Sequence, residues 1–301
     1  MRGSIKQSAP TNELSAVSKY IIFHIIRIAE NLSRVLRRGL SAKPNKKDMI
    51  DMNIHTYGTD ERLGYCREYL YEKNIHSVRE IILLPIPTSR DGITVLGTGK
   101  TPEMLFGDSL AGAVAVGYGI PKAFKEYFSK MGACTADVSL DGKFLEDNAY
   151  LTAEGTVGKI LTEYSSAPSE LSIGIIGYGR IGKRLVNILA FLGASLRVFT
   201  KRCEIAEELC MSGISGVCMT GDDKTLAEAF SGLDIIINTA PAPLVFGCAL
   251  DSLSDTEIIE LASGDNFPKG TKITRLPSLP AKMYPRSAGK VLADSVLRMI
   301  E

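Results

Sequence analysis

The sequence predicts an α/β fold made of two doubly wound parallel-sheet domains. Short β-rich runs alternate with helix-patterned segments along most of the 301 residues, and strands separated by helices pair in parallel. The polar stretch 165–169 divides this alternation into two series of similar style. A chain of this length has room for two domains of about 100 to 200 residues, each with its own core.

The first series contains four candidate strands and three helical patterns. The strands are expected at 53–57, 80–84, 113–116 and 133–138, and the helices near 60–71, 121–130 and 152–164. Thr152 is the expected N-cap of the last helix, because a hydroxyl before a helical pattern satisfies free backbone N–H groups.

The second series has the same style and is longer. Its strands are expected at 172–176, 196–199, 216–219, 234–238, 257–261 and 272–276, and its helices at 180–192, 204–211 and 222–230. A last helix, 287–300, follows Pro285.

Composition excludes several classes of protein. The chain has 35 Lys and Arg against 34 Asp and Glu, a net charge of +1, so no overall field attracts nucleic acid or an anionic membrane. No stretch approaches the roughly 20 apolar residues that span a bilayer. Among the six cysteines, Cys203, Cys210 and Cys218 are too widely spaced for zinc-binding pairs. We expect that the cysteines are buried and reduced, that no metal is bound and that the protein is cytoplasmic.

Residues 1–50 differ from the remainder in charge. They carry ten basic side chains against three acids, and five apolar residues from Ile21 to Val35 recur at helical spacing. A basic amphipathic helix of this kind can lie on anionic lipid or dock in a partner's groove. The favoured alternative is a loosely packed appendage or a translated leader, because Met49 and Met52 precede the first convincing strand.

The strongest local signal is a glycine-rich turn between a strand and a helix. After the strand 172–176 come Gly177, Tyr178, Gly179, Arg180, Ile181 and Gly182. Gly177 permits the tight turn, Gly179 lets the backbone approach a pyrophosphate, and Gly182 lets the helix pack closely on the strand. The pattern predicts a Rossmann dinucleotide-binding domain with the pyrophosphate at the helix N-terminus. A glycine-rich turn without a ligand is the alternative.

The residues after the second strand of this domain discriminate between cofactors. An NAD site places an acidic residue there to bind the ribose 2′-hydroxyl, whereas this chain has Thr200, Lys201 and Arg202. Two cations would pair with a 2′-phosphate. We therefore predict NADP; the alternative is that Lys201 and Arg202 are solvated loop charges.

Two further strand ends complete the predicted cofactor cleft. The strand 234–238 continues into Thr239, Ala240 and Pro241, and the strand 257–261 continues into Ala262 and Ser263. Ligands of such sheets bind at the carboxyl ends of the strands, so these residues are expected to line the nicotinamide side unless they are ordinary loops.

The order of motifs from about Asn53 onward resembles the dipicolinate synthase A family, whose fold is related to D-2-hydroxyacid dehydrogenases and adenosylhomocysteinase. The matching pieces besides the glycine turn, the basic turn and the two strand ends are Gly58-x-Asp60-x-Arg62, Leu84-Pro85 with its following loop, Asn148 with Thr152-Ala153-Glu154-Gly155, Leu276-Pro277 to Pro280, and Pro285-Arg286-Ser287-Ala288-Gly289.

The resemblance implies oxidation of a dihydrodipicolinate-type heterocycle to dipicolinate, a reaction of sporulation, with a nicotinamide cofactor and a flavoprotein-like second subunit. Three departures concern the substrate: Pro87 stands in the loop after Leu-Pro, Gly264 stands where the family has Arg, and the loop from Asp265 is rewritten.

Few residues are available for acid–base catalysis. The three histidines lie at positions 24, 55 and 76, outside the cofactor half, which argues against a 2-hydroxyacid dehydrogenase. Aromatisation of a dihydropyridine is less demanding, and a water or a carboxylate could take the ring proton. Glu154, placed at the start of the junction helix, is the predicted catalytic carboxylate; its alternative role is that of a solvated first-turn acid.

A substrate with two carboxylates requires cations and hydrogen-bond donors. Arg286 and Ser287 begin the last helix, whose positive dipole end suits an anion. Thr88 and Ser89 (with Arg90) are the facing candidates of the first domain, and the motif residue Thr152 is another. Lys282, Asp60 and Arg62 are weaker candidates, and the alternative for these groups is capping and turn formation.

The expected organisation is a basic extension at 1–50, a flavodoxin-like substrate domain at 51–150, a Rossmann NADP-binding domain at 151–285 and a C-terminal helix at 286–301. We also expect a homo-oligomer. Two other functions remain open. The rewritten substrate loops permit an NADP-dependent reductase of another small acid, and the missing histidine permits a non-catalytic NADP-binding subunit.

Overall fold

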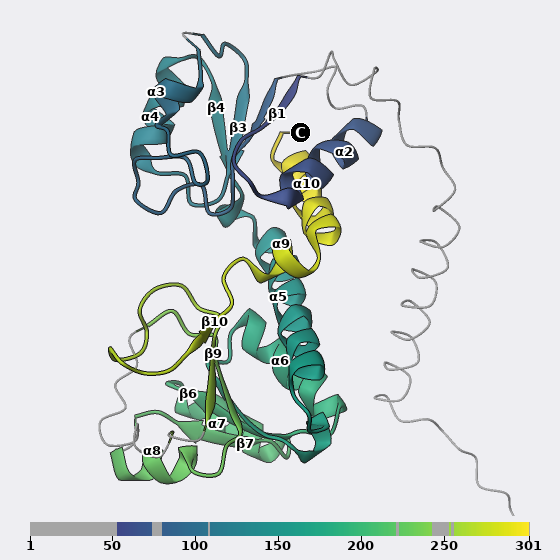
Figure 1. Cartoon of the computed structure of the whole chain (residues 1–301), viewed down its shortest axis with the longest axis vertical. Helices are drawn as coiled ribbons and strands as arrows, with labels where there is room; N and C mark the ends of the chain where they lie inside the picture. The colour runs from purple at the N-terminus through teal and green to yellow at the C-terminus, as the bar shows by residue number, and fades with distance from the viewer. Residues whose placement is uncertain are drawn as a thin grey trace, which may run out of the picture. The chain divides into compact units, whose positions relative to one another are not determined.

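The computed structural model describes residues 53–73, 80–107, 109–220, 223–242, 253 and 256–300. It contains two parallel sheets, each with helices beside it, which confirms the predicted fold class (Figure 1). The expected helix at 21–35 lies outside the described residues. Within the described ranges, none of the helices has the length and apolarity needed to cross a bilayer.

The first sheet has four parallel strands in the order β1-β2-β3-β4. Its elements are β1 (Ile54–Thr56), α2 (Glu61–Glu72), β2 (Ile81–Leu83), α3 (Pro102–Leu105), β3 (Val114–Gly117), α4 (Lys122–Lys130) and β4 (Cys134–Asp137). In a flavodoxin-like order β1 would lie between β2 and β3, so that part of the prediction is wrong. Alternation of strands and helices predicts a parallel sheet, but it does not encode which strands are neighbours.

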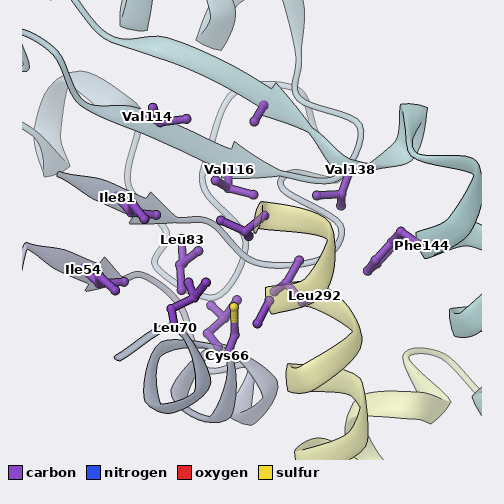
Figure 2. Packing of buried hydrophobic residues seen from close by; sticks show 14 residues of the cluster. Ile54, Cys66, Leu70, Ile81, Leu83, Val114, Val116, Val138, Phe144 and Leu292 are labelled. Carbon is purple, nitrogen blue, oxygen red and sulfur yellow. The ribbon is translucent and has the colours of Figure 1, made fainter. Parts of the chain in front are cut away.

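The C-terminal helix belongs to the core of this first sheet. Helix α10 (Pro285–Ile300) and helix α2 cover one face, and Leu292 of α10 packs with Leu70 of α2 and with Leu83 and Val116 of the strands (Figure 2). Helix α4 covers the other face. The last sixteen described residues therefore complete the half of the chain that begins at β1.

Helix α5 (Gly142–Glu163) connects the two sheets and begins earlier than the sequence predicts. Its N-cap is Asp141, whose carboxylate accepts a hydrogen bond from the backbone N–H of Lys143 at 2.9 Å. The same carboxylate accepts hydrogen bonds from Ser295 and Arg298 of α10, at 2.6 Å each. Thr152 is therefore not a cap but a buried residue in the middle of the helix.

The second sheet has six parallel strands in the order β10-β9-β8-β5-β6-β7. Its elements are β5 (Ser172–Ile176), α6 (Arg180–Phe191), β6 (Ser195–Thr200), α7 (Cys203–Met211), β7 (Ser215–Cys218), α8 (Asp223–Phe230), β8 (Ile235–Asn238), β9 (Glu257–Glu260) and β10 (Thr274–Arg275). Helix α9 (Leu279–Met283), which the sequence patterns did not predict, follows. The direction of strand succession reverses between β5 and β8, which is the Rossmann topology.

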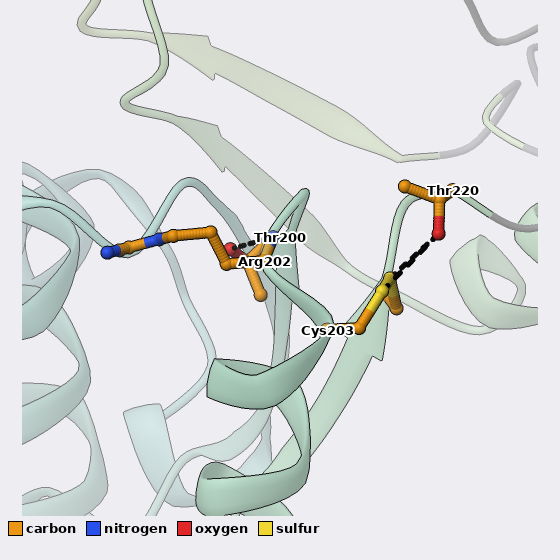
Figure 3. Close-up of a disulfide and its surroundings, with 5 residues drawn as sticks. Thr200, Arg202, Cys203 and Thr220 are labelled. Atoms are coloured by element: carbon orange, nitrogen blue, oxygen red, sulfur yellow. Dashed lines mark hydrogen bonds between the residues drawn. A yellow bond between two sulfur atoms is a disulfide. The ribbon is translucent and has the colours of Figure 1, made fainter.

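Cys203 and Cys218 form a disulfide (Figure 3). Cys203 begins α7 and Cys218 ends β7, and the β6-α7-β7 crossover brings their Cα atoms to 4.8 Å. Cys210 is exposed. The expectation of reduced cysteines is wrong at Cys203 and Cys218, because only the folded crossover shows which cysteines meet. The expectation of burial is wrong at Cys210 and Cys134, which are free but exposed.

Reduction of this disulfide is expected to lower the free energy of unfolding by about 3 kcal/mol, because it closes a loop of about 15 residues in the unfolded chain. Urea unfolding with and without a thiol reductant measures the difference. A Cys203→Ala/Cys218→Ala variant should show the lower stability in both conditions, and Cys134→Ala, which alters an exposed free cysteine, should behave like the original chain. Equal stability of the original chain in both conditions would contradict the assignment.

Candidate functional site

The glycine turn after β5 has the backbone geometry that was predicted for Gly177 and Gly182. Gly177 has φ of +94°, and its N–H donates to the carbonyl oxygen of Phe199 at 2.8 Å. A Cβ atom on Gly182 would lie 2.1 Å from the carbonyl oxygen of Gly177. The N-terminus of α6 is therefore in direct backbone contact with the turn, and only glycine fits at position 182.

Gly179, between them, faces open space. It is the N-cap of α6 and, as a glycine, offers no side chain to cap the helix; a Cβ atom on it would meet nothing within 4 Å. Arg180 and Ile181 form the first turn with Gly182, and Tyr178 lies beside Lys183, whose Nζ is 5.5 Å from the ring centroid. A helix N-terminus with free N–H groups and open space in front of it suits an anion such as a pyrophosphate.

The basic turn after β6 reaches back to the glycine turn. Thr200 is buried, and its hydroxyl oxygen accepts a hydrogen bond from the backbone N–H of Arg202 at 3.2 Å (Figure 3). The Arg202 guanidinium donates to the carbonyl oxygen of Tyr178 at 3.1 Å. Lys201 is exposed. One of the two predicted cations is thus fixed beside the glycine turn, while the other extends from the same turn into solvent.

Thr239 closes the turn from the neighbouring strand at the topological switch point. Its hydroxyl donates to the carbonyl oxygen of Ile176 at 2.9 Å and lies 3.2 Å from that of Gly177. The role of this hydroxyl is therefore to anchor the glycine turn. Ala240 also borders Gly177, while Pro241 is exposed. Thr239 and Ala240 of the three predicted residues therefore lie beside the glycine turn.

A buried carboxylate at the end of β9 escaped the sequence analysis. Glu260 is 2% exposed, and Asn238 donates to both of its oxygens, at 3.0 and 3.2 Å. The backbone N–H of Ala262 and the amide of Asn266 also donate to it, at 2.9 and 3.3 Å. Burial raises the pKa of the Glu260 carboxyl, against the hydrogen bonds from the two asparagines, which lower it. The available sequence signal was a second acid, after Glu257, at the carboxyl end of a four-residue strand.

The substrate candidates of the first half are differently placed. Thr88 is completely buried, and its hydroxyl oxygen accepts a hydrogen bond from the backbone N–H of Tyr118 at 2.9 Å. Its hydroxyl therefore fixes the loop after β2 rather than facing a ligand. The Ser89 hydroxyl donates to Asp91 at 2.9 Å within the same loop.

The junction-helix candidates lie along α5. The buried hydroxyl of Thr152 donates to the carbonyl oxygen of Asn148 at 2.8 Å, one turn earlier in the helix, so it is already engaged. Glu154 lies in the middle of α5, 3.6 Å from the Arg184 guanidinium of α6. The expectation that Glu154 is a first-turn acid at the mouth of the helix is wrong, because α5 begins at Gly142.

Arg286 and Ser287 are exposed in the first turn of α10, as predicted. A separate cavity has a volume of about 420 Å³. It is lined by Thr59, Asp60, Pro85, Ile86, Ser278 and Lys282, among others. It combines the loop after β1, the loop after β2 and the start of α9. Lys282 is its exposed cation, whereas Arg62 is 2% exposed and paired with Asp60 at 2.8 Å.

The described residues contain no cluster of three or more His, Cys, Asp or Glu side chains arranged to hold a metal ion. The strand order and the glycine turn define a Rossmann-type α/β protein in which the N-terminus of α6 follows the glycine turn at the switch point of the sheet. No family model matches the chain.

The predicted resemblance is confirmed by comparison with known proteins. The chain is 29% identical over 163 residues to dipicolinate synthase A of Bacillus subtilis strain 168. The match covers 51% of this chain and 53% of the relative, so it spans about half the relative's length.

Solved structures show the same fold. Crystal structures of dipicolinate synthase A from Bacillus halodurans and Bacillus subtilis match with TM-scores of 0.66 and 0.65, at 19% and 18% identity. Each match covers 82% of this chain, together with 97% and 95% of the two solved chains. A transhydrogenase from Sinorhizobium meliloti matches with a TM-score of 0.51 at 22% identity, over 63% of this chain and 68% of that one.

Proposed function

We propose that this chain binds NADP at the glycine turn and acts as an oxidoreductase similar to dipicolinate synthase A, converting a dihydrodipicolinate-type ring to dipicolinate. The observation that carries the proposal is the α6 N-terminus, where Gly179 faces open space and Arg202 is hydrogen-bonded to the turn through Tyr178. The similarity to the Bacillus proteins supports the choice of substrate class.

The residues present fit the proposed cofactor. The α6 N–H groups would hold the pyrophosphate, and Arg202 with Lys201 would hold a 2′-phosphate, because cations pair with it where an acid would repel it. The ends of β8 and β9 would line the nicotinamide side, with Thr239 anchoring the turn and Ala262 and Ser263 in the second loop. The bound cofactor would supply the hydride acceptor.

The substrate half of the proposal uses three groups of this chain. Lys282, exposed at the 420 Å³ cavity, would attract one carboxylate of the substrate, and Arg286 and Ser287 would attract the other at the α10 N-terminus. Glu154, a half-exposed carboxylate, would accept the ring proton.

Assembly and location are parts of the same proposal. The Bacillus subtilis relative is named as one subunit of dipicolinate synthase, which supports a second subunit for this chain. We propose that this second subunit is flavoprotein-like. We also propose a homo-oligomer in the cytoplasm, a substrate domain and a cofactor domain that meet within α5, and α10 as a helix of the substrate half.

A titration with NADPH and with NADH tests the cofactor. We expect NADPH to bind at least about tenfold more tightly, because the two cations gain a partner only in NADPH. A Lys201→Asp/Arg202→Ala variant should lose this preference. A matched control, Lys122→Asp/Lys130→Ala, changes two exposed cations of α4 and should keep it. Equal affinities of the original chain for both cofactors would contradict the NADP assignment.

A product assay tests the reaction separately. Dihydrodipicolinate would be supplied with the oxidised form of the preferred cofactor, with and without a candidate second subunit, and dipicolinate would be measured. Cofactor binding without dipicolinate in either arm would contradict the proposed reaction and leave the binding site standing.

A further inference from the structure

We propose that Glu260 is a positioning residue: its buried carboxylate fixes the two loops that would line the nicotinamide side of the cofactor. This inference rests on the proposed function for its effect on cofactor binding. The loops are 239–242, after β8, and 261–266, after β9, and Glu260 is the last residue of β9.

The hydrogen bonds to the Glu260 carboxylate come from the second loop and from Asn238, at the strand end that precedes the first loop. Asn238 ends β8 and donates to both oxygens, and its own Oδ1 accepts the backbone N–H of Ala240 at 3.1 Å. Ala262 and Asn266 donate from the second loop. Strand β8 lies between β9 and β5, and β5 leads into the glycine turn. The carboxylate therefore links both loops to the glycine turn.

The charged groups around Glu260 hold the outer side of the second loop. Arg275 of β10 stands opposite Glu260 of β9 in the strand register. Its guanidinium donates to the carbonyl oxygen of Gly264 at 2.9 Å and to the carboxylate of Asp265 at 3.0 Å. The loop is thus bound from the interior by Glu260 and from the exposed side by Arg275. The Glu260 carboxylate accepts four hydrogen bonds, so it holds the loop in place and is not free to exchange a proton with substrate.

Both oxygens of the Glu260 carboxylate must act as hydrogen-bond acceptors, because donors point at each of them. In Glu260→Gln, one oxygen becomes an NH₂ group that faces the amide nitrogen of Asn266. Rotation of the Asn266 amide would not repair this, because the same nitrogen also donates to the carbonyl oxygen of Ser263 at 3.1 Å. A buried donor left without an acceptor is costly, so the second loop is expected to loosen.

The test compares Glu260→Gln and Glu260→Asp with the original chain, using Glu228→Gln on α8 as the matched control for lost charge. Amide hydrogen exchange reports on the loops, a titration reports the dissociation constant of NADPH, and steady-state kinetics report kcat. We expect Glu260→Gln to speed exchange in 261–266 and to weaken NADPH about tenfold, with kcat at saturating cofactor within about threefold. Glu260→Asp, which keeps two acceptor oxygens, should recover part of the affinity.

Three results would overturn the inference. Unchanged loop exchange in Glu260→Gln would show that the carboxylate does not fix the loops. A large fall in kcat with unchanged affinity would show that Glu260 acts on the substrate. Faster exchange throughout the second sheet would show a general structural role. If the original chain binds neither NADPH nor NADH, the proposed function fails, and the exchange data still decide whether Glu260 fixes the loops.

Discussion

Replacing Gly182 with alanine is expected to lower the free energy of unfolding by about 3 kcal/mol. The new methyl carbon would lie 2.1 Å from the carbonyl oxygen of Gly177, far inside van der Waals contact. That oxygen cannot move freely, because the N–H of Gly177 is bonded to Phe199 and its carbonyl borders the Thr239 hydroxyl. Helix α6 would have to shift away from β5, and the two elements belong to one buried core.

The matched variant is Gly179→Ala, three residues earlier. A Cβ atom there meets nothing within 4 Å, and φ of −90° is open to alanine, so stability should change by less than about 0.5 kcal/mol. The methyl group would occupy the space in front of the α6 N-terminus, so NADPH should bind at least about tenfold more weakly. Urea unfolding and NADPH titration of both variants measure the two effects separately. Normal NADPH binding by Gly179→Ala would contradict a pyrophosphate at this turn, and full stability of Gly182→Ala would contradict the backbone contact.

This difference between the two glycines shows what a sequence can encode. The strand, the turn and the helix follow one another directly in the sequence. The spacing of Gly177, Gly179 and Gly182 therefore predicts how they are arranged. The second sheet was therefore predictable nearly to its residue bounds, for example β5 at Ser172–Ile176.

The errors concern features that depend on distant parts of the chain. Thr88 carries a hydroxyl in a loop, as a ligand-binding residue would, but its oxygen accepts a hydrogen bond from the backbone N–H of Tyr118, just after the next strand. Cys203 and Cys218 meet only through a crossover, and Glu260 meets its partners only where two strands end together. The early start of α5 is different, because Asp141 before a helical stretch is a cap signal that was present in the sequence.

The second large effect is expected from Asp60→Asn, which should lower the free energy of unfolding by about 3 kcal/mol. The Arg62 side chain is 3% exposed, and its Nε donates to both oxygens of Asp60, at 2.9 and 2.8 Å. Asparagine still caps helix α2, because its side-chain oxygen can accept the backbone N–H of Arg62 as Asp60 does at 3.2 Å. The loss would therefore come from leaving a buried guanidinium without its counter-charge, and urea unfolding at neutral pH measures it.

Removing both charges separates this cause from simple loss of contacts. In Asp60→Asn/Arg62→Met no unpaired charge stays buried, and most of the stability should return. The guanidinium also donates to the carbonyl oxygen of Ile86 at 3.3 Å, so the pair joins the loops after β1 and β2 that wall the cavity around Lys282. If Asp60→Asn were as stable as the original chain, Arg62 would be solvated and free to bind a substrate carboxylate. A double variant less stable than Asp60→Asn would instead show that Arg62 stabilises the two loops mainly through Ile86. The expected recovery would leave Lys282 as the cavity's cation for the substrate.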